Sequence, residues 1–138
     1  MSKTAREIMS SDAQCVIESE TIAEAAQKMK SLDVGALPIC GQDDRLKGML
    51  TDRDIVVKVL ADGKDPNETT AGELTQGKPV TIGADDSAEE ALRTMTEHKV
   101  RRLPVIDGHE LIGVLSQGDL ATELGAEQVG ELVGAISA

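Results

Sequence analysis

The sequence contains an internal repeat, and this repeat restricts the fold more than any single motif does. The segments AREIM, SETIAEAAQKM and LPIC begin at residues 5, 19 and 37, and they recur loosely as AGELT, DDSAEEALRTM and LPVI from residues 71, 85 and 103. Beyond the turn sequence GQDDR the spacing shortens by one residue, so that GMLTDRD from residue 48 corresponds to GVLSQGD from residue 113. We therefore expect two copies of one small unit.

The order of secondary structure can be predicted within each copy. A short strand precedes a helix whose apolar positions, such as Ile22, Ala25 and Met29, recur at helical spacing. A capping box, Thr21 with Glu24, marks the start of that helix. Two strands joined by a turn and a second helix follow. The sequence thus predicts an α/β fold with two β-α-β-β-α repeats packed about a pseudo-twofold axis.

The repeat also sets the expected domain boundaries. We expect the first repeat over residues 1–65, the second over residues 66–125, and a C-terminal helix over residues 126–138. Residues 61–73 are polar and contain Gly and Pro, which is typical of a connector.

Composition and charge exclude several classes of function. The chain has no Phe, Trp or Tyr, so its core must be aliphatic. Its net charge of -11 opposes binding to nucleic acid, which requires clustered Lys and Arg. It has neither an apolar run long enough for a membrane nor the apolar stretch of a signal peptide. These features predict a cytoplasmic protein that binds neither nucleic acid nor membrane.

The motif GMLTDRDI, from residue 48, admits four interpretations: an acid pair, a metal site, a helix cap or a phosphate clamp. Asp52 and Asp54 lie two positions apart at a helix start and point in different directions, which excludes paired catalytic carboxylates. Thr51 and Asp54 have the spacing of a capping box. A cap and a binding site are compatible, because a carboxylate accepts several hydrogen bonds.

No catalytic or metal-binding set is visible. His98 and His109 are the only imidazoles, and they form neither a Ser-His-Asp set nor paired ligand spacing with each other or with Cys15 and Cys40. We expect no metal, no required cofactor and no enzymatic activity.

The repeated motifs resemble a tandem pair of cystathionine beta-synthase (CBS) domains, also called a Bateman module. The residues that carry the resemblance are LPI from residue 37, LPV from residue 103, and the two glycine-to-aspartate motifs that begin at Gly48 and Gly113. One such motif alone is weak, but their occurrence twice in the same order, over nearly the whole chain, is specific.

The resemblance implies a sensor of an adenosine ligand such as AMP, ADP, ATP or S-adenosylmethionine, bound in a cleft between the repeats. It assigns Asp54 and Asp119 to ribose, and Thr51 and Ser116 to phosphate.

Arginines distinguish the two repeats. Arg101 and Arg102 precede the second LPV segment, where family members often place phosphate-binding residues; two solvated arginines are an equal alternative. The first repeat has Gly35 and Ala36 at these positions, which predicts unequal sites. Arg53 either reaches phosphate or forms a local salt bridge.

Cys15 and Cys40 are either two buried thiols, the interpretation that we favour, or a redox pair closed as a disulfide. Within the expected fold, parallel neighbouring strands would place a strand start and a strand end far apart, which disfavours a bond; an N-terminal segment that folds back could bring them together.

These observations predict a non-enzymatic regulatory protein that senses an adenosine nucleotide and signals, as a homodimer, to an unknown effector protein. The alternative is a stress-response interaction protein with the same fold and empty clefts. The aliphatic helix residues Ile55, Val56, Val59 and Leu60, with counterparts around Leu120 and Leu124, are the expected dimer surface.

Overall fold

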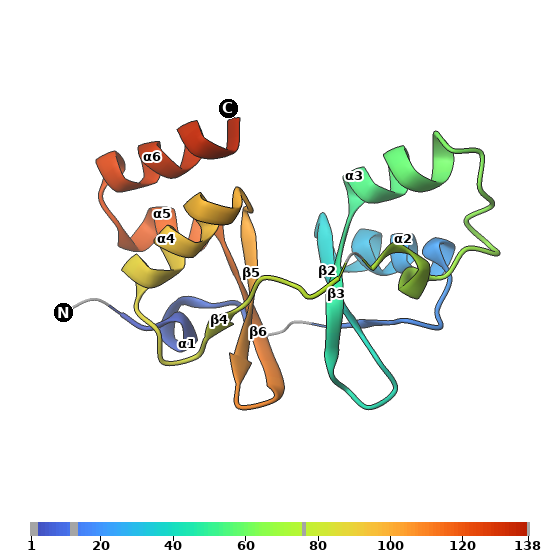
Figure 1. Ribbon diagram of the computed structural model, residues 1–138, viewed down its shortest axis with the longest axis horizontal. Helices are drawn as coiled ribbons and strands as arrows, with labels where there is room; N and C mark the ends of the chain where they lie inside the picture. Colours follow the sequence, from blue (N-terminus) through green and yellow to red (C-terminus); the bar gives the residue numbers. More distant parts are fainter. Residues whose placement is uncertain (1–2, 12–13, 76, 138) are drawn as a thin grey trace. The chain divides into compact units, whose positions relative to one another are not determined.

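The structure is a computed structural model, and it describes residues 3–11, 14–75 and 77–137. The chain forms two compact units (Figure 1). Residues 14–79 make up what we call the first-repeat unit, and residues 1–13 with 80–138 make up the second-repeat unit. Each is described by itself below.

The first-repeat unit has a three-stranded sheet in the order β1-β2-β3. Strand β1 runs parallel to β2, and β2 runs antiparallel to β3. Its elements are β1 (Val16–Ile17), α2 (Ile22–Leu32), β2 (Ala36–Cys40), β3 (Leu46–Thr51), α3 (Asp52–Asp54), the π-helix η1 (Ile55–Leu60) and the 3-10 helix η2 (Ala71–Leu74).

The second-repeat unit repeats this order with the sheet β4-β5-β6. Its helix α6 packs on α4 and α5, as Figure 1 shows. The elements are α1 (Ala5–Ile8), β4 (Ile82–Gly83), α4 (Ala88–His98), β5 (Arg102–Asp107), β6 (Glu110–Ser116), α5 (Gln117–Glu123) and α6 (Ala126–Ser137). The predicted α/β class and the repeated β-α-β-β-α order are confirmed, and the pseudo-twofold packing stays a prediction.

Each unit has its own aliphatic core, as the absence of aromatic residues requires. Ile22, Ala25 and Met29 of α2 are buried, as their spacing predicts, together with Leu37 and Leu50 of the sheet. The equivalent set in the other unit is formed by Ala88, Ala91, Met95, Leu103 and Leu115, and α6 adds Leu132. No helix in the described ranges is long and apolar enough to cross a membrane.

The segment that precedes each repeat in sequence packs on the other repeat. Thr4 and Ser10 form bridges with Ser87 and Val114 of the second repeat. In the same way, Thr70 bridges to Thr21 of the first repeat. The compact units therefore differ from the sequence division after residue 65, because backbone hydrogen bonds hold these exchanged segments to the neighbouring repeat.

The expected connector is largely ordered by this packing. The N–H of Ala71 donates to Glu20 O at 2.9 Å, and the N–H of Ile22 donates to Thr69 O at 2.8 Å. Residues 66–74 are thus part of the first-repeat unit rather than a free linker.

The glycine that opens each repeated motif makes room for an exchanged segment. A Cβ atom on Gly113 would lie 2.6 Å from the carbonyl oxygen of Ser10. A Cβ on Gly48 would lie 3.3 Å from Thr75 Cγ2. Because real Cβ contacts under 3.0 Å are essentially absent, Gly113 is needed for the N-terminal segment to cross β6.

Candidate functional site

The candidate site of the second repeat lies where β5 begins and β6 ends. Arg102 and Ser116 are directly opposite each other in the antiparallel pair, so both side chains emerge on one face. The N–H of Gln117 donates to Arg101 O at 2.8 Å, which closes the turn between α4 and β5 against the start of α5. Folding thereby brings together four predicted residues of this repeat: Arg101, Arg102, Ser116 and Asp119.

Ser116 and Asp119 form a reciprocal cap. The N–H of Ser116 donates to Asp119 Oδ2 at 2.8 Å, and the N–H of Asp119 donates to Ser116 Oγ at 3.1 Å. Both residues are partly exposed. The predicted capping box is confirmed, and it fixes the direction of the carboxylate while leaving Oδ1 without a hydrogen bond from the described residues.

The first repeat builds the same backbone arrangement. Ala36 is opposite Thr51, and the N–H of Asp52 donates to Gly35 O at 2.9 Å. The N–H of Thr51 donates to Asp54 Oδ2 at 3.0 Å, and the N–H of Asp54 donates to Thr51 Oγ1 at 3.1 Å. This predicted capping box is confirmed as well, so the two edges can be compared atom by atom.

The aspartates differ in their ion pairs. Lys58 Nζ lies 3.1 Å from Asp54 Oδ1. Burial raises the pKa of Asp54, but the Thr51 N–H and the Lys58 ammonium outweigh it, and the pKa falls below its usual range. In the second repeat the residue four positions after Asp119 is Glu123, which pairs with Lys3 at 3.2 Å. The sequence analysis did not predict this contact of Lys58.

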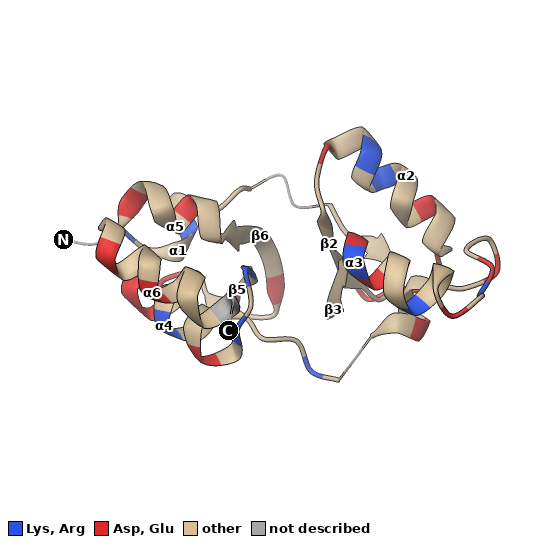
Figure 2. Ribbon diagram, turned by 90° about the horizontal axis from the view of Figure 1, so that it is seen from above, with Lys and Arg blue, Asp and Glu red and all other residues tan. Residues whose placement is uncertain are grey.

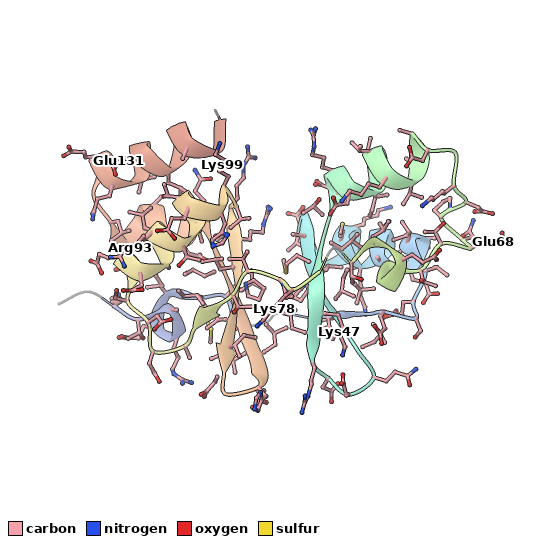
Figure 3. The ribbon with its side chains drawn as sticks, viewed as in Figure 1. Lys47, Glu68, Lys78, Arg93, Lys99 and Glu131 are labelled. Carbon is pink, nitrogen blue, oxygen red and sulfur yellow. A yellow bond between two sulfur atoms is a disulfide. The ribbon has the colours of Figure 1, made fainter. Side chains whose placement is uncertain are left out.

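Three basic residues without ion pairs gather at the second-repeat edge. Lys99, Arg101 and Arg102 are exposed, and none pairs with an acid among the described residues. Figure 2 shows basic residues at the start of β5, and Figure 3 labels Lys99 at the end of α4. The other cations described in this unit are all paired with acids: Lys3, Arg6 and Arg93.

Lys99 is a residue that sequence reasoning missed. It occupies a left-handed conformation after α4 with φ of 54°, and its counterpart after α2 is Asp33 with φ of 55°. The charge therefore reverses at an equivalent backbone position. This reversal could have been found in the sequence. The constant repeat spacing aligns Asp33 with Lys99, just as it aligns Gly35 and Ala36 with the two arginines.

Arg53 is exposed at the start of α3. Its backbone N–H donates to Asp52 Oδ1 at 2.8 Å, but its guanidinium makes no ion pair with the described residues. Asp54 pairs with Lys58 instead, so the predicted local salt bridge of Arg53 does not form in this structure.

Cys15 and Cys40 are joined in a disulfide, with Cα atoms 5.7 Å apart. Our expectation of two free thiols is therefore wrong. The strand β1 has only two residues and places Ile17 opposite Cys40, so Cys15 before the strand is still close to the end of β2. We had expected parallel neighbouring strands to place a strand start and a strand end far apart, and this does not hold for a strand of two residues. A redox function of the pair stays a prediction.

The two imidazoles have different places relative to the second-repeat edge, since His98 directly precedes Lys99 and His109 lies beyond β5. His98 is the last residue of α4, and His109 is exposed in the turn between β5 and β6. Within residues 3–11, 14–75 and 77–137, no three His, Cys, Asp or Glu side chains are grouped so that they could hold a metal ion.

Known proteins resemble the chain over most of its length. Hypoxic response protein 1 of Mycobacterium tuberculosis is 52% identical over 133 residues, which cover 96% of this chain and 93% of that protein. A crystal structure of Hypoxic Response Protein I with two coordinated zinc ions is similar with a TM-score of 0.83 and 54% identity, over 89% of this chain and 100% of that chain.

A more distant solved structure is a hexameric CBS-CP12 protein from bloom-forming cyanobacteria. It has a TM-score of 0.78 and 30% identity, over 87% of this chain and 67% of that chain. The family model of the CBS domain matches twice, at residues 5–61 and 71–126. These two matches cover most of the sequence and coincide with the repeated fold, and the chain therefore belongs to the CBS domain family.

Proposed function

We propose that this CBS-pair protein is a non-enzymatic sensor that binds a phosphorylated adenosine nucleotide, with the second-repeat edge as its principal site. The observation that carries the proposal is the cluster of Lys99, Arg101 and Arg102 beside Ser116 and Asp119. Among the described residues of the second-repeat unit, the cations without an ion pair all lie in this one turn, although the chain has a net charge of -11. Such a cluster suits a phosphate group.

The carboxylate supplies the complementary half of the site. Asp119 Oδ2 accepts the Ser116 N–H, and each carboxylate oxygen has two lone pairs, so both oxygens can still accept from ribose hydroxyls. Ser116 Oγ accepts the Asp119 N–H, and its own O–H remains able to donate to a phosphate oxygen. Ribose and phosphate thereby have separate partners on one edge.

We assign the chain to regulation rather than to catalysis. Proteins made of paired CBS domains are generally regulatory, and the edges described above contain a cap and cations but no paired acid and base. The resemblance to Hypoxic response protein 1 supports a role in a stress response, through an effector protein that remains to be found. The cytoplasmic location stays a prediction.

The second candidate function is an interaction protein whose edges stay empty. The ion pair of Asp54 with Lys58 and the acidic residue Asp33 favour this alternative for the first repeat. The second-repeat edge is the one that distinguishes the two candidates.

We further propose that the chain forms a homodimer through exposed aliphatic residues of η1. The exposed fractions of Val56, Val57 and Leu60 are 56%, 45% and 57%. Two residues expected at this surface, Val59 and Leu120, are instead fully buried in the unit cores. Hexamers of the related cyanobacterial protein support self-association. Val56→Asp should give a monomer in analytical ultracentrifugation, and an unchanged sedimentation coefficient would remove η1 from the interface.

The test of nucleotide binding uses the absence of Trp and Tyr. The protein absorbs little near 280 nm, so a nucleotide retained through purification dominates the ultraviolet spectrum. Stripped protein is then titrated with AMP, ADP, ATP and S-adenosylmethionine by calorimetry. A clean spectrum together with no heat and no thermal shift for any of these ligands would leave the empty-edge alternative.

Variants locate the site. Asp119→Ala and Arg102→Ala should weaken binding at least tenfold, since each removes a contact to a charged group worth about 1.5–3 kcal/mol. Asp54→Ala should change it less, and Arg93→Ala serves as the control because Arg93 pairs with Glu90 on α4. Equal losses at Asp54 and Asp119 would contradict the assignment of the second-repeat edge.

A further inference from the structure

We propose that Lys58 is an internal competitor for the ribose site of the first repeat, so that the chain takes up adenosine far more weakly at Asp54 than at Asp119. This inference rests on the proposed function, and it adds a specificity-determining residue to it. Lys58 belongs to η1 and lies four residues after Asp54, on the same side of the helical segment.

The contacts of Asp54 leave little room for a ligand. Its Oδ1 lies 3.1 Å from Lys58 Nζ, and its Oδ2 accepts the N–H of Thr51 at 3.0 Å. The side chains of Lys58 and Asp54 are only 33% and 23% exposed, so the pair is held at the edge rather than dispersed in solvent. The ammonium occupies one acceptor direction of Oδ1, so two vicinal ribose hydroxyls that donate to both oxygens must compete with Lys58 for this carboxylate.

The second repeat has the opposite arrangement. Asp119 accepts the N–H of Ser116, and no cation pairs with it among the described residues. At the position equivalent to Lys58 stands Glu123, which is held by Lys3 at 3.2 Å. The same capped carboxylate is therefore paired with a lysine in one repeat and, among the described residues, with no cation in the other.

The turn after α2 does not compensate a ligand for this competition, which leaves Arg53, among the described residues, as the unpaired cation beside Asp54. Asp33, Gly35 and Ala36 stand where the second repeat has Lys99, Arg101 and Arg102. A nucleotide that displaced Lys58 would gain no arginine contact from the turn after α2, and its phosphate would approach the carboxylate of Asp33. Lys58 thus competes with the ligand in the repeat whose turn offers no cation to the phosphate.

The experiment measures each repeat separately by NMR. The amides of Thr51 and Ser116 donate to Asp54 and Asp119, so their shifts report on the two carboxylates. Wild type, Lys58→Met and Lys30→Met are titrated with adenosine, which tests ribose without phosphate, and then with AMP. Methionine keeps the length of the apolar stem, and Lys30 is an exposed residue of α2 without an ion pair among the described residues.

We expect Lys58→Met to lower the adenosine midpoint at the Thr51 amide roughly fivefold to tenfold, which is between the effects of an exposed ion pair and of a charged hydrogen bond. The Ser116 midpoint should not change, and Lys30→Met should behave as wild type. An unchanged Thr51 midpoint while Ser116 responds would overturn the role of Lys58 and leave the nucleotide site intact. An equal lowering of the Thr51 midpoint in Lys30→Met would also overturn the role of Lys58.

If neither the Thr51 amide nor the Ser116 amide responds to adenosine or AMP in any variant, the proposed function and this inference are both overturned.

A converse pair of variants tests the same idea at the other repeat. Glu123→Lys places an ammonium four residues after Asp119 and should weaken adenosine binding at the Ser116 amide severalfold. Glu123→Gln removes the contact to Lys3 without adding a cation and should not; equal losses in the two variants would also count against competition by a lysine.

Discussion

The two repeats have the same backbone at their candidate edges but differ in the charge of the turn that precedes the middle strand of each sheet. In both, a residue at the start of one strand is opposite a hydroxyl residue that caps the next helix. The turn carries Asp33 in the first repeat and three cations in the second. The repeated residues thus build the fold, whereas the residues that fail to repeat determine what each edge can bind.

The largest expected difference between the repeats concerns the disulfide. Cys15 and Cys40 constrain only the first-repeat unit, because Thr81 and Ile106 occupy the equivalent positions. Closing a loop of 25 residues stabilises a fold by about 3 kcal/mol. Reduction, or replacement of both cysteines by alanine, should therefore lower the unfolding midpoint of the first-repeat unit, measured by circular dichroism and by hydrogen exchange of each unit. Equal loss of protection in both units would show that the bond acts on the whole chain.

The next largest effect should come from the crossing of the exchanged segments. In Gly113→Ala the new Cβ meets the backbone of Ser10, which cannot move without breaking the bridge to Val114, and we expect a loss of roughly 2 kcal/mol. In Gly48→Ala the neighbour is the side chain of Thr75, and the loss should stay below about 1 kcal/mol. Urea unfolding of both variants measures the difference, and the reverse order would refute this account of the glycines.

A smaller effect, equal in both repeats, is expected from the caps. Thr51→Ala and Ser116→Ala each remove one side-chain acceptor at a helix start, at a cost of about 1 kcal/mol. Only Ser116→Ala should also weaken nucleotide binding. Thermal unfolding with and without AMP separates the two consequences. If Thr51→Ala weakened binding as much, the structural cap and the binding site could not be distinguished in this way.

The smallest expected effect is the pH dependence of the stability that the ion pair of Asp54 and Lys58 contributes. The pKa of Asp54 is below its usual range in the folded state, so its contribution is complete above the unfolded pKa of about 4 and disappears as the pH falls through the folded pKa. Lys58→Met should cost only about 0.5 kcal/mol at pH 7.

Urea unfolding of wild type and Lys58→Met at pH 7 and at successively lower pH follows this difference. The free energies of unfolding of the two proteins should become equal at acidic pH. A difference that persisted there would point to packing of the lysine stem rather than to its charge.

The fold could be predicted from the sequence because the same pattern occurs twice. The helical spacing of Ile22, Ala25 and Met29 identified a buried face, and all three are buried. The capping boxes at Thr51 and Ser116 were also correct, whereas at Thr21 only the hydroxyl half of the predicted box forms, with Thr21 Oγ1 accepting the N–H of Glu24. In contrast, the exchange of segments such as residues 3–10 depends on hydrogen bonds between distant backbone groups, which leave no periodic signal in the sequence.

The candidate sites were predictable in part. Alignment of the repeats identified Asp54 and Asp119 and the missing arginines of the first repeat. The disulfide was missed because the separation expected between the start and end of parallel strands was applied to β1, whose two residues leave Cys15 close to the end of β2. The contact of Lys58 was missed because an acid and a lysine four residues apart are common on solvated helices.

The exchange of segments has a consequence for synthesis on the ribosome. The first-repeat unit is continuous in sequence, from residue 14 to residue 79, and can form once that stretch has emerged. The second-repeat unit needs residues 1–13 together with residues 80–138. The segment of residues 3–10 therefore stays without its partners until residues 84–114, which hold them, have been translated, and during that interval its backbone groups remain open to other contacts.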